Sequence, residues 1–64
     1  MISDLDIWRS ANELIKQFGD TADIEAAARA DALLDKGDLD GQRVWQRILK
    51  AIEEMQNTAF GKAN

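Results

Sequence analysis

The apolar residues of this chain recur at steps of three and four, and the steps are interrupted where a glycine is followed by an aspartate. Apolar residues at such a spacing line one face of an α-helix. Glycine adopts the left-handed conformation that commonly ends a helix, and aspartate is a favoured first residue, or N-cap, of the next one. Gly19-Asp20 and Gly37-Asp38 therefore divide the 64 residues into three predicted helices.

The predicted helices cover residues 4–18, 20–36 and 39–57, and residues 58–64 are expected to form a frayed tail. The expected N-caps are Ser3, Asp20 and Asp38. Helices joined by only two or three residues pack as antiparallel neighbours, because no longer connection is available to cross the bundle. The sequence thus predicts an all-α fold, a three-helix up-down-up bundle with short turns at Gly19 and Gly37, in a single helical domain of residues 1–64.

The composition excludes most of the chemistry that small proteins perform. Without cysteine or histidine, the chain cannot form a disulfide, a thiolate or histidine metal site, or a histidine-dependent catalytic triad. Carboxylates remain as general acids or bases, but they need a concave pocket that a small helical bundle does not suggest. Asp31 lies near the border of an apolar face, where exposure to water is favoured over partial burial opposite Arg43. We therefore expect a non-enzymatic protein with no catalytic residue, no metal ion and no cofactor.

Hydropathy and charge along the chain bear on its location. Neither end carries a basic region followed by an apolar run, and no apolar run approaches the length that crosses a bilayer. A hydrophobic content of 45% argues against disorder. We expect a folded, cytoplasmic protein that makes no contact with a membrane.

A stretch in the middle of the chain resembles part of a calcium-binding loop. Placing Gly41 at the sixth position of an EF-hand loop puts Asp38 and Asp40 at the third and fifth positions. The first and twelfth positions, which need an aspartate and a bidentate glutamate, then fall on Lys36 and Arg47. Two cations in place of two anionic ligands argue against calcium, and turn and capping chemistry is the favoured interpretation.

Three basic residues of the third predicted helix, Arg43, Arg47 and Lys50, lie close to one another on its surface. A helix that follows a glycine turn is where helix-turn-helix proteins keep the residues that read DNA. The first turn of this helix carries Asp38 and Asp40, however, and the net charge of -4 opposes binding to phosphates. A solvated, partly salt-bridged face is favoured. A nucleic-acid or anion-binding regulator that uses the three basic residues is the alternative function.

Large apolar side chains are numerous for three short helices, and the second helix contributes mainly alanine. Some are therefore expected to stay exposed, and exposed apolar patches commonly mark interfaces. The leading prediction is a protein-interaction module that forms a homodimer or binds a larger protein partner. The interface candidates are Trp8, Trp45, Leu49, Ile52 and Met55. Core packing is the favoured alternative for each tryptophan taken alone.

Residues 34–45, LDKGDLDGQRVW, resemble the turn between the two helices of a tetratricopeptide repeat, where glycine ends one helix and aspartate caps the next. The match is local, because Gln42 stands where the repeat has a small residue, and Ala26 and Arg29 stand at its aromatic and leucine positions. Nearly the whole chain is similar to a family of short bacterial proteins of unknown function, through the segments DIW, FGD, RADALLDKGD, DG and VWQRILKAIEEM. That resemblance implies a small helical bacterial protein and no activity, cofactor or catalytic residue.

Overall fold

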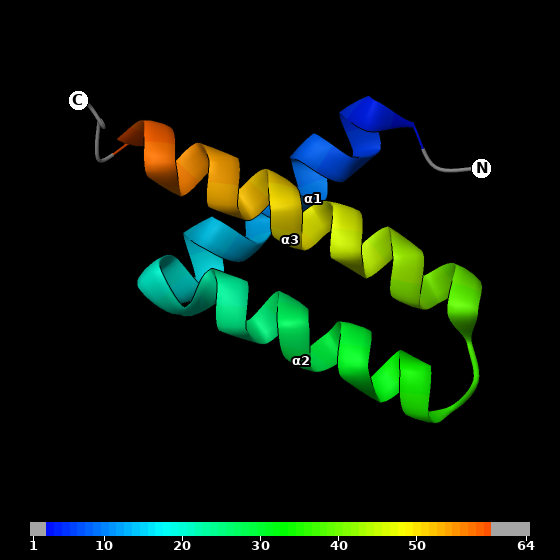
Figure 1. Ribbon diagram of the computed structural model, residues 1–64. Helices are drawn as coiled ribbons and strands as arrows, with labels where there is room; N and C mark the ends of the chain where they lie inside the picture. Colours follow the sequence, from blue (N-terminus) through cyan, green and yellow to red (C-terminus); the bar gives the residue numbers. More distant parts are fainter. Residues whose placement is uncertain (1–2, 60–64) are drawn as a thin grey trace.

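Helices account for nearly all of the chain that the computed structural model describes, which is residues 3–59 (Figure 1). α1 spans Asp4–Phe18, the short 3-10 helix η1 spans Gly19–Thr21, α2 spans Ala22–Asp35 and α3 spans Leu39–Ala59. These residues include no strand, so the predicted all-α fold is confirmed. α3 runs two residues past its predicted end, and the rest of the predicted tail lies outside the described residues.

α1 begins at the predicted cap. Ser3 has an extended backbone, and its hydroxyl oxygen accepts a hydrogen bond from the Asp6 N–H at 3.2 Å. The Ser3 carbonyl also accepts the N–H of Ile7 at 3.1 Å. Asp4 and Asp6 lie in the first turn. Negative charge is favourable there, because the backbone N–H groups at the start of a helix carry partial positive charge. The predicted start of this helix depends on neighbouring residues alone, and it is confirmed.

The junction between α1 and α2 is a bend in a continuing helix. Gly19 has a φ of 59°, and its N–H donates to the Ile15 carbonyl, as expected of the residue that ends a helix. The chain nevertheless continues as η1, in which the Thr21 hydroxyl donates to the Phe18 carbonyl at 3.0 Å. α1, η1 and α2 thus follow one another as one bent helix, and α3 is the second helix of the described residues.

Asp20 was predicted to cap the second helix, and that prediction is wrong. Asp20 lies inside η1, α2 begins at Ala22, and Thr21 stands at the cap position without a side-chain cap hydrogen bond. α2 also ends at Asp35, one residue before its predicted end. The physical reason is that η1 supplies a backbone partner at the start of α2, where the Ala22 N–H donates to the Gly19 carbonyl.

The turn between α2 and α3 has the two hydrogen bonds of a Schellman motif. Gly37, with a φ of 79°, donates its N–H to the Leu34 carbonyl at 2.9 Å, and Asp38 donates its N–H to the Leu33 carbonyl at 2.9 Å. A positive φ favours glycine, since other residues have a Cβ that crowds the backbone there. The turn predicted at Gly37 is confirmed.

Asp38 starts α3 as predicted. Its Oδ1 accepts the N–H of Gly41 at 2.9 Å, and its carbonyl accepts the N–H of Gln42 at 3.0 Å. The bond from Gly41 satisfies a first-turn donor that would otherwise lack a partner, and the bond from Gln42 is the first regular hydrogen bond of the helix. The residues that resembled a calcium loop therefore belong to a helix cap and a helix.

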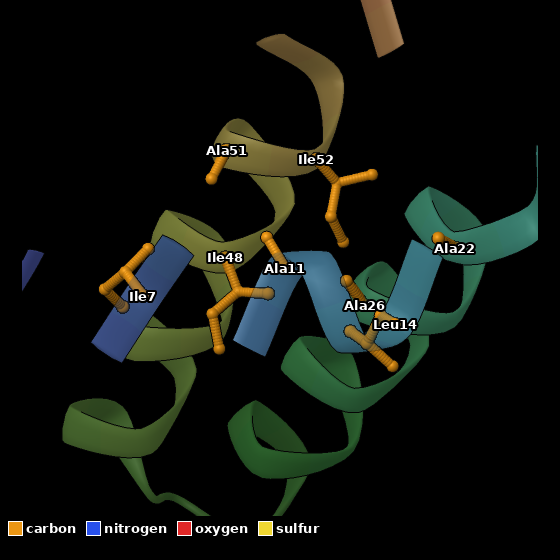
Figure 2. Packing of buried hydrophobic residues seen from close by; sticks show 8 residues of the cluster. All are labelled: Ile7, Ala11, Leu14, Ala22, Ala26, Ile48, Ala51 and Ile52. Carbon is orange, nitrogen blue, oxygen red and sulfur yellow. The ribbon is translucent and has the colours of Figure 1, made fainter. Parts of the chain in front are cut away.

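The core lies where α1, α2 and α3 meet (Figure 2). Its buried members are Ile7, Ala11, Leu14, Ala22, Ala26, Ile48, Ala51 and Ile52. The alanines of α2 let its backbone approach the other helices closely, but each buries little area. Most of the large buried side chains therefore come from α1 and α3.

Both arms of the bent helix, α1 and α2, pack against α3. α2 and α3 lie side by side and antiparallel after the Gly37 turn, and α1 crosses behind α3 in the view of Figure 1 and contacts both of them. Two contacts mark the ends of the crossing. Arg47 bonds Asp4 at the start of α1, and the Gln56 amide donates to the Gly19 carbonyl at its end. α1 therefore covers the second half of α3 and leaves the first half of α3 to α2.

Candidate functional site

A groove runs between α1 and the C-terminal part of α3. It has a volume of about 510 Å³. Its lining residues are Trp8, Arg9, Asn12, Ile15, Met55 and Gln56. Ile15 and Met55 also pack against the core, so the apolar part of the groove continues the core outward. An open apolar groove with a few polar groups at its edge is the usual form of a binding site for another molecule.

Trp8 is the main exposed aromatic side chain at this groove. It is 49% exposed, and Leu5, three residues earlier on the same helix, is 58% exposed. Residues three and four apart lie on one face of a helix, so Leu5 and Trp8 continue toward Asn12 and Ile15. We call this set with Met55 the Trp8 surface, which comprises Leu5, Trp8, Asn12, Ile15 and Met55.

The exposed stripe arises because α1 is apolar over a wide arc. Its buried stripe consists of Ile7, Ala11 and Leu14, and Trp8 lies one residue on from Ile7. One residue is about 100° around a helix, since a turn takes about 3.6 residues. The two stripes thus face different directions, and α3 covers the one that contains Ile7.

A second groove, of about 390 Å³, lies on the other side of Trp8 and is lined largely by charged residues. Those charged residues are Asp4, Arg47, Lys50 and Glu54. Arg47 Nη2 lies 2.6 Å from Asp4 Oδ1. Both side chains are well exposed, so this ion pair contributes roughly 0–1 kcal/mol to stability. Its main effect is to orient Arg47 toward α1.

The basic stripe predicted on α3 is solvent-exposed and partly paired. Arg43, Arg47 and Lys50 are all exposed, as expected for a solvated face. Arg47 is engaged by Asp4, which reduces the positive charge that a phosphate would meet. The Asp38 carboxylate also stands at the start of the same helix and would repel an approaching anion.

Trp45, an interface candidate, packs in the contact between α2 and α3. The Arg29 guanidinium carbon lies 5.1 Å from the centroid of the Trp45 ring, a cation–π distance. Arg29 Nε also lies 3.0 Å from Glu25 Oε2. Trp45 is half-buried beneath this pair and lines a groove of about 300 Å³ beside α1. Trp45 therefore contributes mainly to the packing of α2 against α3.

The remaining interface candidates have different environments. Ile52 is fully buried in the core, so it has no surface to offer a partner, and its place in the predicted interface is wrong. Leu49 is half-buried and packs against the core. Met55 is also half-buried, but it lines the apolar groove. Of the predicted set, Trp8 and Met55 are brought together at one site.

The sequence interpretation missed several exposed apolar residues. These are Leu5, Phe18, Ile24, Leu34 and Leu39. Leu5 lies one turn before Trp8 on the same helix face, and this spacing could have indicated that Leu5 is exposed beside Trp8. Leu34 and Leu39 stand on either side of the Gly37 turn, and residues next to a turn at the end of a helix pair have few neighbours to cover them.

Two further positions, Asp31 and Gly41, bear on the sequence interpretation. Asp31 is exposed, as the favoured interpretation had it, and does not lie buried opposite Arg43. A Cβ at Gly41 would lie 2.8 Å from Oδ2 of Asp38, so the absence of a side chain at Gly41 makes room for the helix cap.

No protein-family model, curated protein or solved structure matches the chain. The resemblances to the bacterial family and to the tetratricopeptide hairpin therefore stay predictions. Within residues 3–59, no helix combines the length and the apolar character that a membrane span requires. In the same residues, no group of three or more carboxylate, histidine or cysteine side chains is placed to hold a metal ion.

Proposed function

We propose that the protein is a small, non-enzymatic interaction module that self-associates through the Trp8 surface. The observation that carries the proposal is the position of Trp8, which is half exposed between two grooves and next to Leu5. Tryptophan is enriched among the residues that dominate binding energy, because it offers a large, rigid contact area. An apolar patch that stays in contact with water is otherwise unfavourable.

The size of the chain supports the proposal. A chain of 64 residues buries a smaller fraction of its surface than a larger domain does, and its stability is correspondingly marginal. A standard interface covers about 800 Å² of each partner. That contact area is less than a fifth of the 4467 Å² of accessible surface of the chain. In the proposed contact, the Trp8 surface lies at the centre of the interface. Association would add the burial that the small core lacks.

The proposal includes the finer architecture predicted from the sequence, a three-helix up-down-up bundle. In its support, α1 and α3 run in the same direction between the Asp4–Arg47 and Gly19–Gln56 contacts, with α2 antiparallel to α3. A cytoplasmic location and a bacterial origin belong to the same proposal as predictions from the sequence.

A nucleic-acid or anion-binding function remains the competing proposal, and the local electrostatics support it less well. Arg47 is already paired with Asp4, and the net charge of the chain is -4. Phosphate binding depends on accumulated positive charge. Retention on a phosphate matrix that is lost in an Arg43→Ala, Arg47→Ala double variant would favour it over self-association.

The experiment that tests self-association is sedimentation equilibrium of the full chain over a range of micromolar concentrations. We expect a mass above that of the monomer, and we expect Trp8→Ala to shift the protein toward monomer by at least tenfold in dissociation constant, or about 1.4 kcal/mol. Ile24→Ala is the matched control, since Ile24 is an exposed apolar residue of α2 that lines none of the three grooves. A strictly monomeric wild-type protein would overturn the proposal.

A further inference from the structure

The turn between α2 and α3 forms an apolar and acidic end of the molecule. Leu34 is 48% exposed and Leu39 is 54% exposed, one on each side of Gly37. Residues 31–40 also hold four of the twelve acidic residues and one basic residue, Lys36. We call this the leucine end, which comprises Asp31, Leu34, Asp35, Leu39 and Asp40.

The groove at the Trp8 surface has the opposite charge at its edge. Arg9 lines the apolar groove, and Arg47 and Lys50 line the neighbouring one. Arg9 and Lys50 form no ion pair within residues 3–59. The two grooves thus contribute three of the eight basic residues, against two of the twelve acidic ones, Asp4 and Glu54.

These two features lie far apart on the molecule. Leu39 begins α3, and Met55, which lines the groove, lies sixteen residues later on the same helix. At about 1.5 Å per residue, the separation along the helix is about 24 Å. This separation is more than half of the 39 Å long dimension of the molecule, and the leucine end of a chain therefore cannot reach its own groove.

We propose that the groove at the Trp8 surface receives the leucine end of a second copy of this chain, so that copies associate head to tail. This inference rests on the proposed function and names the partner surface. Leu34 and Leu39 fill the apolar groove against Ile15 and Met55. Asp31, Asp35 and Asp40 lie near Arg9 and Lys50, and these charges orient the contact.

Shape favours this arrangement over a symmetric one. In a two-fold dimer, the same patch faces itself. Two Trp8 surfaces facing each other would place groove against groove, which leaves space that neither copy fills, whereas interface cores are packed as densely as protein interiors. A projecting helix end with two exposed leucines has the form that fills a groove.

Charge favours it as well. Facing Trp8 surfaces would bring together two patches that both contain the cations Arg9 and Lys50, and like charges at an interface are unfavourable. The leucine end brings carboxylates to these cations. A head-to-tail contact does not close on itself unless the rotation between copies completes a ring, so the expected products are short linear oligomers or a ring.

A mixing experiment tests the arrangement with two full-length variants. The groove variant is Trp8→Ala, which keeps the leucine end intact. The end variant is Leu34→Ser with Leu39→Ser, which keeps the groove intact. Each is checked for helical content by far-ultraviolet circular dichroism, and native mass spectrometry distinguishes their masses in a mixture.

We expect each variant alone to lose self-association by at least about tenfold. An equimolar mixture should form a 1:1 heterodimer, because the end variant supplies an intact groove and the groove variant supplies an intact leucine end. No intact groove or leucine end is left over, so larger oligomers should not form. If the end variant associates like the wild type, or if the mixture gives no heterodimer, the head-to-tail contact is wrong although self-association stands. If the wild-type chain does not associate at all, both proposals fail.

Charge provides a second readout on variants that keep every apolar contact. Arg9→Gln with Lys50→Gln should weaken wild-type association by about threefold to tenfold, and it should reduce the loss of association that salt causes. Lys16→Gln is the matched control, since Lys16 is an exposed basic residue of α1 that lines none of the three grooves. Equal effects of the two changes would contradict the proposed contact.

Discussion

Ile52 and Ile24 have the same side chain in opposite environments. Ile52 is fully buried among core residues, whereas Ile24 is 66% exposed. Buried apolar groups contribute to stability through both transfer from water and close packing, and exposed ones contribute neither. The consequence for mutation depends on which of the two positions is changed.

We predict that Ile52→Val lowers the free energy of unfolding by about 0.5–1.5 kcal/mol, because it removes one buried methylene and leaves a small cavity. Ile24→Val should change it by no more than about 0.5 kcal/mol. Urea denaturation followed by circular dichroism measures both variants. Equal losses at the two positions would show that Ile52 is not in the core.

At the scale of the element, the two glycine junctions show what the sequence could and could not predict. The Gly37 turn depends on neighbouring residues alone, the Schellman bonds and the Asp38 cap, so its sequence pattern was sufficient. At Gly19 the same pattern gives a bend, since η1 continues the helix and the Gln56 amide bonds the Gly19 carbonyl from α3. That contact comes from a residue distant in the sequence, which a local pattern does not reveal.

The candidate site was predictable to a similar degree. Periodicity identified both Trp8 and Ile52 as apolar-face residues, and the two have similar sequence signals. Which of them is covered depends on where α1 crosses α3. The crossing buries the stripe of Ile7 and leaves the neighbouring stripe of Trp8 exposed. Wide apolar arcs therefore predict that some residues are exposed, but not which ones.

The start of α3 allows a prediction about coupling. Gly41 within a helix costs up to about 1 kcal/mol relative to alanine. A Cβ there would lie 2.8 Å from Asp38 Oδ2, so alanine displaces the capping carboxylate, and loss of a cap costs about 0.5–2 kcal/mol. We expect Gly41→Ala to give little or no stabilisation in the wild type and a clear stabilisation in an Asp38→Ala background. A double-mutant cycle by urea denaturation measures the difference, and additive effects would contradict it.

The contact between α2 and α3 gives a further prediction at this scale. Arg29 stacks on Trp45 and pairs with Glu25, and both interactions are partly exposed. We expect Arg29→Ala to lower the free energy of unfolding by about 1 kcal/mol, the sum of a cation–π contact and a surface ion pair. Arg29→Lys should retain part of it, since lysine stacks less well on an aromatic ring. Arg43→Ala, at an exposed arginine outside this contact, is the control for loss of charge in thermal unfolding.

At the scale of the whole molecule, self-association and folding are linked. The bent helix and α3 together bury only a small set of side chains, three of the eight core residues being alanines of α1 or α2 and one an alanine of α3. A contact that only the folded chain can make stabilises that state by mass action. The melting temperature therefore reports on association as well as on the core.

We predict that the melting temperature of the wild-type chain rises with protein concentration. Above the dissociation constant, each tenfold increase in concentration adds up to about 1.4 kcal/mol to the folded state, and 1 kcal/mol corresponds to about 4–8 °C in a domain of this size. Trp8→Ala should abolish the dependence, because it removes the central contact of the interface and leaves the core residues in place. Ile24→Ala should retain it. Scanning calorimetry at several concentrations makes the comparison, and a wild-type melting temperature independent of concentration would mean that the exposed Trp8 contributes to no self-contact.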